Sequence, residues 1–142
     1  MAEFTLDPRL AQDSLLLAQG PLSQLRLMDD LRFPWLVLVP RIHGASEWLE
    51  LEKREQGLLL EELNAAADAL RRCGPCDKLN IGALGNIVRQ LHVHLVARRE
   101  GDAAWPGPVW GAGSMQRASA VELPERVERV RTHLDPLFWR VG

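Results

Sequence analysis

Hydrophobic and polar positions follow two different periods along the chain, which predicts both helices and strands. Within residues 59–70 apolar side chains recur at the i, i+4, i+7 and i+11 spacing of an amphipathic helix, at Leu59, Leu63, Ala66 and Leu70. We expect this helix to span residues 52–73. Shorter apolar runs bounded by Gly or Pro predict strands instead. The strands are expected at 14–18, 22–28, 35–39, 79–84 and 87–99, with shorter helices at 7–12 and 124–135.

Sequential strands joined by short turns, with few helices, favour an α+β class and an antiparallel sheet. The 142 residues suit a single domain, residues 1–142. A composition of 46% hydrophobic and 25% charged residues excludes a mostly disordered chain. The net charge of −2 argues against a basic surface for duplex nucleic acid, so no nucleic-acid partner is expected.

The longest apolar runs are far shorter than the roughly 18 residues of a membrane span. The first ten residues also lack the basic and apolar regions of a secretory leader. We therefore expect no membrane association and a cytoplasmic location.

Two cysteines form the sequence CGPC at residues 73–76, which resembles the active-site motif of thioredoxins. That chemistry places the first thiol at a helix N-terminus, where the helix dipole stabilises the thiolate. Here the cysteines follow the predicted helix, and Gly74 and Pro75 are typical of a helix end. We expect a turn without a redox role.

Residues 87–99, IVRQLHVHLVARR, are the segment with the most chemical information. Side chains alternate between the two faces of a strand. The odd positions from Leu91 to Ala97 would form an apolar face, while the even positions carry Gln90, His92 and His94. Two imidazoles spaced about 6.5–7 Å apart can engage one phosphate or one metal ion. A solvent-facing strand that tolerates polar residues is the alternative, and spacing alone leaves both open.

The segment before this strand, NIGALGN at residues 80–86, contains two glycines and two amides. Glycine permits a close approach of the backbone to a ligand, so the N–H groups there can converge on an anion. The same composition also makes ordinary turns.

Residues 80–96 resemble the signature of the histidine triad (HIT) family of nucleotide hydrolases and transferases. In that signature a Gly-Gln loop precedes three histidines that alternate with apolar residues. Gln90 falls at the first histidine, His92 at the middle one and His94 at the third, while Asn86 replaces the loop glutamine. The resemblance extends over residues 14–100, and residues 105–111, WPGPVWG, are similar to the tail of a bacterial, dinucleoside-polyphosphate hydrolase-like branch.

The resemblance implies a HIT-like fold: about five antiparallel strands, one long helix and a C-terminal helix. It also implies that His92 attacks the α-phosphorus of a nucleoside phosphate derivative, a dinucleoside polyphosphate or a phosphoramidate, to form a covalent nucleotidyl-histidine. His94 and Gln90 would complete the catalytic group. The implied substrate-binding residues are Asn80, Gly85, Asn86, Asp29 and Asp30.

This covalent route demands no metal or cofactor, although the substrate can arrive as a Mg²⁺ complex. The family usually pairs two protomers, so the resemblance also implies a homodimer.

Two alternatives remain open at this stage. An amide cannot supply a proton near neutral pH, so Gln90 is compatible with a nucleotide-binding module that has little catalytic activity. The other alternative is a cupin-like metal site formed by His92, His94 and Glu100. In that pattern the spacing between His94 and Glu100 is one residue longer than usual.

Overall fold

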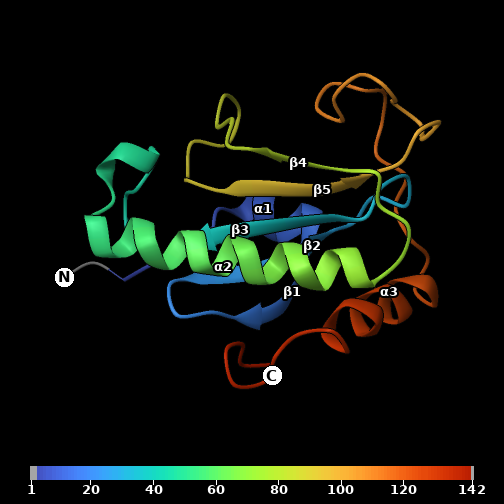
Figure 1. Ribbon diagram of the computed structural model, residues 1–142. Helices are drawn as coiled ribbons and strands as arrows, with labels where there is room; N and C mark the ends of the chain where they lie inside the picture. Colours follow the sequence, from blue (N-terminus) through green and yellow to red (C-terminus); the bar gives the residue numbers. More distant parts are fainter. Residues whose placement is uncertain (1–2, 142) are drawn as a thin grey trace.

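The computed structural model describes residues 3–141 and contains one five-stranded antiparallel sheet in the order β1-β2-β3-β5-β4 (Figure 1). This confirms the α+β class. The strands are β1 (Ser14–Gln19), β2 (Ser23–Met28), β3 (Trp35–Pro40), β4 (Lys78–Gly82) and β5 (Val93–Arg98). The helices are α1 (Pro8–Asp13), α2 (Lys53–Arg72) and α3 (Glu122–Arg131), with a 3₁₀ turn η1 (Trp48–Glu50).

Helix α2 lies across one face of the sheet, in front of it in Figure 1. It begins with a capping box between Glu52 and Glu55, and two arginines in its last turn suit the negative end of its dipole. Its apolar stripe packs on the sheet in the larger core cluster, which includes Leu59, Ala66 and Leu70. The periodicity therefore predicted this helix correctly, and the CGPC sequence lies in the connection to β4, as expected.

A buried carboxylate ties α2 to the β1–β2 turn. Glu62 is fully buried and accepts hydrogen bonds from the backbone N–H groups of Leu22 and Ser23, at 2.9 and 2.7 Å. Gly20 leaves the space for it, because a Cβ there would lie 2.2 Å from Glu62 Oε2. The Gly-Pro turn that separates the first two strands is thus also a docking point for the long helix.

The second face of the sheet is covered by α1, which lies behind it in Figure 1, and by the segment that follows β5. A smaller apolar cluster forms there from the sheet, α1 and that segment, and it includes Leu10, Met28, Trp35, Val96 and Val109. All six residues of β3 are buried, which confirms that both faces of the 35–39 strand are covered.

The predicted strand at 87–99 is too long. Pairing with β4 ends at Gly82 opposite His94, and pairing with β3 ends at Leu38 opposite Val93, so β5 begins only at Val93. Residues 87–92 approach it as an irregular segment. The C-terminal helix was also predicted too long, because α3 ends at Arg131. No helix among residues 3–141 has the length and apolar character to cross a membrane.

Candidate functional site

Both motif histidines line a cavity of about 480 Å³ beside the smaller apolar cluster. Besides the segment that carries the two histidines, four parts of the chain form its wall: α1, the end of β2 with the start of β3, residues 84–88, and residues 109–115. His92 and His94 are only 7% and 6% exposed, yet both contact this space. The alternative of a solvent-facing strand is therefore wrong, and the two imidazoles belong to one site.

His94 is held by Trp35, a residue that the sequence analysis did not name as part of the site. The indole N–H of Trp35 donates to Nδ1 of His94 at 3.0 Å. An indole can only donate, so Nδ1 is unprotonated and the imidazole proton sits on Nε2. Burial, followed by the nearby charge of His92, lowers the pKa of His94 to about 3. His94 is thus a neutral hydrogen-bond donor at physiological pH.

His92 has the opposite tautomer. Its Nδ1 lies 2.6 Å from the backbone carbonyl oxygen of Gln90. A carbonyl oxygen only accepts, so Nδ1 carries the proton and Nε2 keeps a free lone pair in the neutral ring. The two imidazole rings lie edge to face with centroids 4.8 Å apart. The site therefore pairs a nucleophilic nitrogen on His92 with an N–H donor on His94.

The side chain of Gln90 is engaged with the N-terminal segment. Its Oε1 accepts from the backbone N–H of Asp7, and its Nε2 donates to the carbonyl of Thr5, both at 2.8 Å. Gln90 does not line the cavity of His92 and His94, although it lines a smaller adjoining cavity of about 140 Å³ that His92 also borders.

The loop before the histidines contributes two of its predicted residues to the cavity. Gly85 and Asn86 both line it, and Gly85 adopts a φ of 76°, which favours glycine. Asn80 is placed elsewhere: its Oδ1 accepts a hydrogen bond from the buried Arg98 at 2.8 Å. The structure thus brings the second half of the NIGALGN segment to the site and uses the first half to hold β5.

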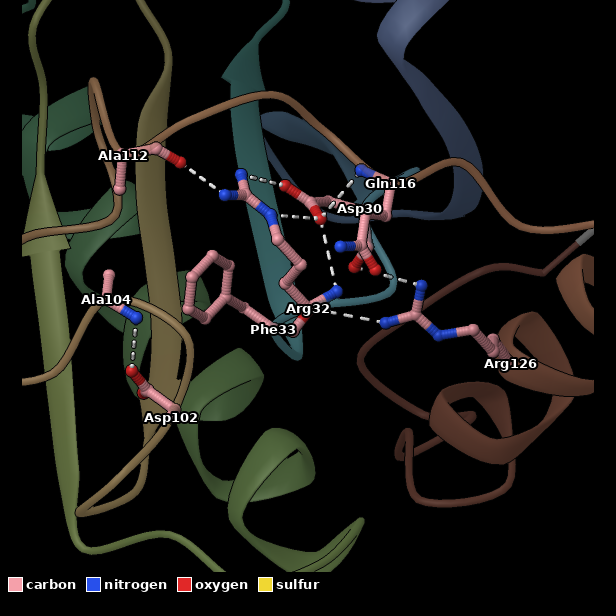
Figure 2. A network of polar contacts seen from close by, with 8 residues as sticks. All are labelled: Asp30, Arg32, Phe33, Asp102, Ala104, Ala112, Gln116 and Arg126. Atoms are coloured by element: carbon pink, nitrogen blue, oxygen red, sulfur yellow. Dashed lines mark hydrogen bonds and ion pairs between the residues drawn. The ribbon is translucent and has the colours of Figure 1, made fainter.

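The two acidic candidates, Asp29 and Asp30, are not among the residues that line the cavity. Asp30 is fully buried and forms an ion pair with Arg32 at 2.8 Å (Figure 2). Asp29 accepts from the backbone N–H of Ala118 at 2.9 Å, and Asp30 accepts from that of Gln116 at 3.3 Å. Their carboxylates hold the segment after β5, which gives a structural reason for their position. Both residues are buried and so do not lie in a solvated turn.

Burial by itself would raise the pKa of Asp30. The guanidinium of Arg32 and the backbone N–H groups of Arg32 and Gln116 outweigh it and hold that pKa below its usual value. Arg32 also donates to the carbonyl of Ala112, and Arg126 donates to the carbonyls of Asp30 and Phe33 (Figure 2). This charged network anchors the segment that follows β5.

That segment, residues 99–119, which we call the tail, closes one side of the cavity. Trp110 packs edge to face on His94 with ring centroids 5.5 Å apart, and Val109 and Met115 also line the space. At its start the buried pair Arg98–Asp102 fixes the turn, and the hydrogen bonds of Asp102 hold its pKa well below the usual value. The sequence predicted no site residue in the tail, although residues 105–111 carried part of the family resemblance.

No group of three His, Cys, Asp or Glu side chains among the described residues is arranged to hold a metal ion. The cupin-like set of His92, His94 and Glu100 is therefore not assembled. Glu100 lies beyond the end of β5 and is exposed.

Comparisons with known proteins identify the family to which this fold belongs. A model of the HIT domain family matches residues 9–101. The chain is similar to a histidine triad protein from Sinorhizobium meliloti 1021, with 47% identity and a TM-score of 0.89 over 92% of this chain and 97% of that chain. It is also similar to a histidine triad protein from Bradyrhizobium japonicum, with 41% identity and a TM-score of 0.90 over 94% of this chain and 100% of that chain. A histidine triad protein from Marinobacter aquaeolei VT8 has 38% identity and a TM-score of 0.91 over 96% of this chain and 99% of that chain. No curated protein sequence matches significantly.

The chain therefore belongs to the HIT domain family, whose proteins typically bind nucleotides or act on them as hydrolases or transferases. The family match ends at Gly101, so most of the tail lies outside the matched region although it forms part of the cavity wall.

Proposed function

We propose that this protein is a nucleotide hydrolase or nucleotidyl transferase that acts at the α-phosphate of nucleoside phosphate derivatives. The observation that carries the proposal is the pair of complementary tautomers: His92 presents a free Nε2 while His94 presents an Nε2–H, both in one cavity. A nucleophile beside a preorganised donor is the arrangement that phosphoryl-group transfer requires.

The reaction would proceed in two steps. His92 Nε2 attacks the α-phosphorus, a P–N bond forms, and the bond to the leaving group breaks with its electron pair going to that group. Water or another acceptor then attacks the same phosphorus, the P–N bond breaks, and its electron pair returns to His92. The proton of the attacking water is released, and the nucleotide leaves.

The other residues of the cavity would orient the phosphate. His94 would donate its Nε2–H to a non-bridging oxygen or to the leaving group, and Asn86 with the backbone around Gly85 would hold further oxygens. The substrate can arrive as a Mg²⁺ complex. The apolar wall of Met28, Val109 and Met115 suits the nucleoside part.

A second candidate is a nucleotide-binding module with little catalytic activity. The observation that favours it is the side chain of Gln90, which is committed to the backbone of Thr5 and Asp7 at the position of the first histidine. This candidate predicts nucleotide binding without turnover of any phosphoramidate or dinucleotide.

Rapid-quench mass spectrometry separates the two candidates. After the protein is mixed with an adenylated substrate, we expect an adduct of one nucleotide that maps to His92. The His92→Ala variant should fold and show neither adduct nor turnover, whereas a matched His133→Ala variant on the C-terminal side of α3 should keep both. Turnover retained in His92→Ala would exclude His92 as the nucleophile, and binding without any adduct in the wild type would favour the second candidate.

We also propose a homodimer formed through the β4 edge of the sheet. The other edge strand, β1, carries a bridge between Gln19 and Arg140, whereas β4 is at the opposite edge and exposes Ile81. Light scattering should give twice the chain mass for the wild type, and Ile81→Lys should shift the mass toward the monomer.

A further inference from the structure

Arg9 is the exposed cation in the wall of the cavity that contains His92. It lies in the first turn of α1, and about half of its side chain is exposed. Its Nε and Nη2 donate to the carboxylate of Asp7 at 3.2 and 3.1 Å, and its Nη1 donates to the carbonyl of Ile87 at 3.0 Å. A guanidinium has five N–H donors, so two remain for a ligand.

These contacts fix where the positive charge lies. Ile87 follows Gly85 and Asn86, so the guanidinium is attached to the same loop that approaches His92. The buried apolar side chains of the cavity, Leu10, Met28 and Val109 among them, belong to the smaller apolar cluster. The site therefore has a polar part, with Arg9 and the loop, and an apolar part.

Gln90 holds the segment that carries Arg9. Its two amide hydrogen bonds fasten the backbone at Thr5 and Asp7, directly before α1, and its own carbonyl orients His92. The carboxylate of Asp7 is held by Arg9 and by the backbone N–H of Arg9, which also keeps its pKa below the usual value. One residue thus couples the position of Arg9 to the position of the nucleophile.

The chemistry of the site also limits the leaving group. His94 is a buried, neutral imidazole that can donate a hydrogen bond but is a weak acid, and Gln90 has no acidic proton, so neither is suited to transfer a full proton to a departing atom. An amine must take up a proton to leave, whereas a phosphate departs as a stable anion. A leaving group that is already anionic needs a cation to receive it, and Arg9 is placed to do so.

We propose that Arg9 is a substrate-binding residue that receives the phosphate groups beyond the α-phosphate, and that Gln90 is the positioning residue that holds the segment carrying it. This inference rests on the proposed function, since it assigns the leaving-group side of that same reaction. In the first step the α-phosphorus–oxygen bond breaks, and the electron pair stays on the bridging oxygen of the departing phosphate. No proton is transferred to that oxygen.

The test compares two substrates that share an adenylyl group and differ in the leaving group: diadenosine triphosphate, which releases ADP, and adenosine phosphoramidate, which releases ammonia. For Arg9→Gln we expect kcat/KM for diadenosine triphosphate to fall about tenfold relative to kcat/KM for adenosine phosphoramidate. A loss of this size is expected when one charge-assisted hydrogen bond at a partly exposed site is removed. Arg9→Lys should recover part of the loss. The matched control is Arg71→Gln, an exposed arginine in the last turn of α2, which should leave the ratio unchanged.

Gln90→Ala tests the positioning role. Releasing the segment should raise KM for diadenosine triphosphate with little change in kcat, and the double variant with Arg9→Gln should be no worse than Arg9→Gln alone, because both act on one contact. Equal losses of kcat on both substrates would make Gln90 part of the chemical step and overturn its role as a positioning residue.

Calorimetry of ADP and AMP binding tests the role of Arg9 independently of catalysis, because it measures affinity and not turnover. Arg9→Gln should weaken ADP about tenfold and leave AMP unchanged. If the wild type turns over neither substrate, the proposed reaction fails, while the ADP and AMP affinities still decide the role of Arg9. Equal ADP affinity in the wild type and in Arg9→Gln would overturn the assignment of Arg9.

Discussion

Trp35 and His94 form a side-chain hydrogen bond between neighbouring strands, with the indole N–H 3.0 Å from Nδ1 of His94. In the β3–β5 register Trp35 lies opposite Val96 and Val37 lies opposite His94, so the indole reaches its partner diagonally. This contact fixes the tautomer of His94 and directs its remaining N–H toward the cavity. Trp35 is thus a positioning residue for the proposed chemistry.

Replacing Trp35 by Phe keeps a ring and removes this donor. Nδ1 of His94 is then free to accept a proton, so we expect the pKa of His94 to rise from about 3 and kcat to fall by about tenfold, typical of losing a hydrogen bond that orients a reactive histidine. NMR titration of the His94 ring and steady-state kinetics measure the two effects. The Trp48→Phe variant, at an exposed indole in η1, should change neither. An unchanged His94 titration in Trp35→Phe would contradict the role of the hydrogen bond.

The low pKa of His94 makes stability depend on pH. The folded chain takes up this proton only near pH 3, whereas the unfolded chain takes it up near its ordinary value of about 6.5. Between these values the unfolded state binds more protons, so the free energy of unfolding should fall as the pH falls, by at most about 1.4 kcal/mol per pH unit for one proton.

Urea denaturation between pH 6.5 and 4.5 measures this slope, because this interval lies above the pH range in which the buried carboxylates take up protons. The pKa values of Asp30 and Asp102 are lowered, so their contribution is lost only below their unfolded values of about 3.9. For His94→Gln, the slope of unfolding free energy against pH should be smaller by the contribution of one proton. The His133→Gln variant should retain the wild-type slope. Parallel curves for the wild type and His94→Gln would be evidence against a buried neutral His94.

The Asp30–Arg32 pair should anchor the tail. Arg32→Met leaves the fully buried carboxylate of Asp30 without its cation, which we expect to cost about 3–5 kcal/mol of unfolding free energy. It also removes the donor to Ala112, so amide hydrogen exchange over residues 112–118 should accelerate. Asp30→Asn combined with Arg32→Met should recover part of the stability, because no unpaired charge remains. A double variant as unstable as Arg32→Met would show that the charge is not the cause.

The CGPC cysteines should have no redox role. Burial raises the pKa of Cys73, against a smaller opposing effect of Arg129, so little thiolate is present at neutral pH. Both cysteines are free, and they follow α2, so neither lies at the N-terminus of that helix. Replacing both by Ser should leave nucleotide turnover unchanged, and labelling of Cys73 by iodoacetamide at neutral pH should be slow. Rapid labelling of Cys73 would contradict this expectation.

The sequence by itself determined the elements and the core of the site. The spacing of Leu59, Ala66 and Leu70 predicted α2, and the apolar runs predicted all five strands, because these patterns depend on local period and on which face is buried. The alternation put Gln90, His92 and His94 on one side of the chain. The two histidines do line one cavity, although His92 precedes the strand, whereas Gln90 does not line it.

Only the tertiary structure decided which groups surround those imidazoles. Trp35 reaches His94 through strand register, Gln90 binds backbone more than 80 residues earlier in the chain, and Asp30 turns toward the tail. Such contacts join segments that are far apart in sequence, so the local periodicity of hydrophobic residues cannot predict them. Side-chain hydrogen bonds of this kind depend on the packing of α1, the sheet and the tail against one another, which is settled only when the whole chain folds.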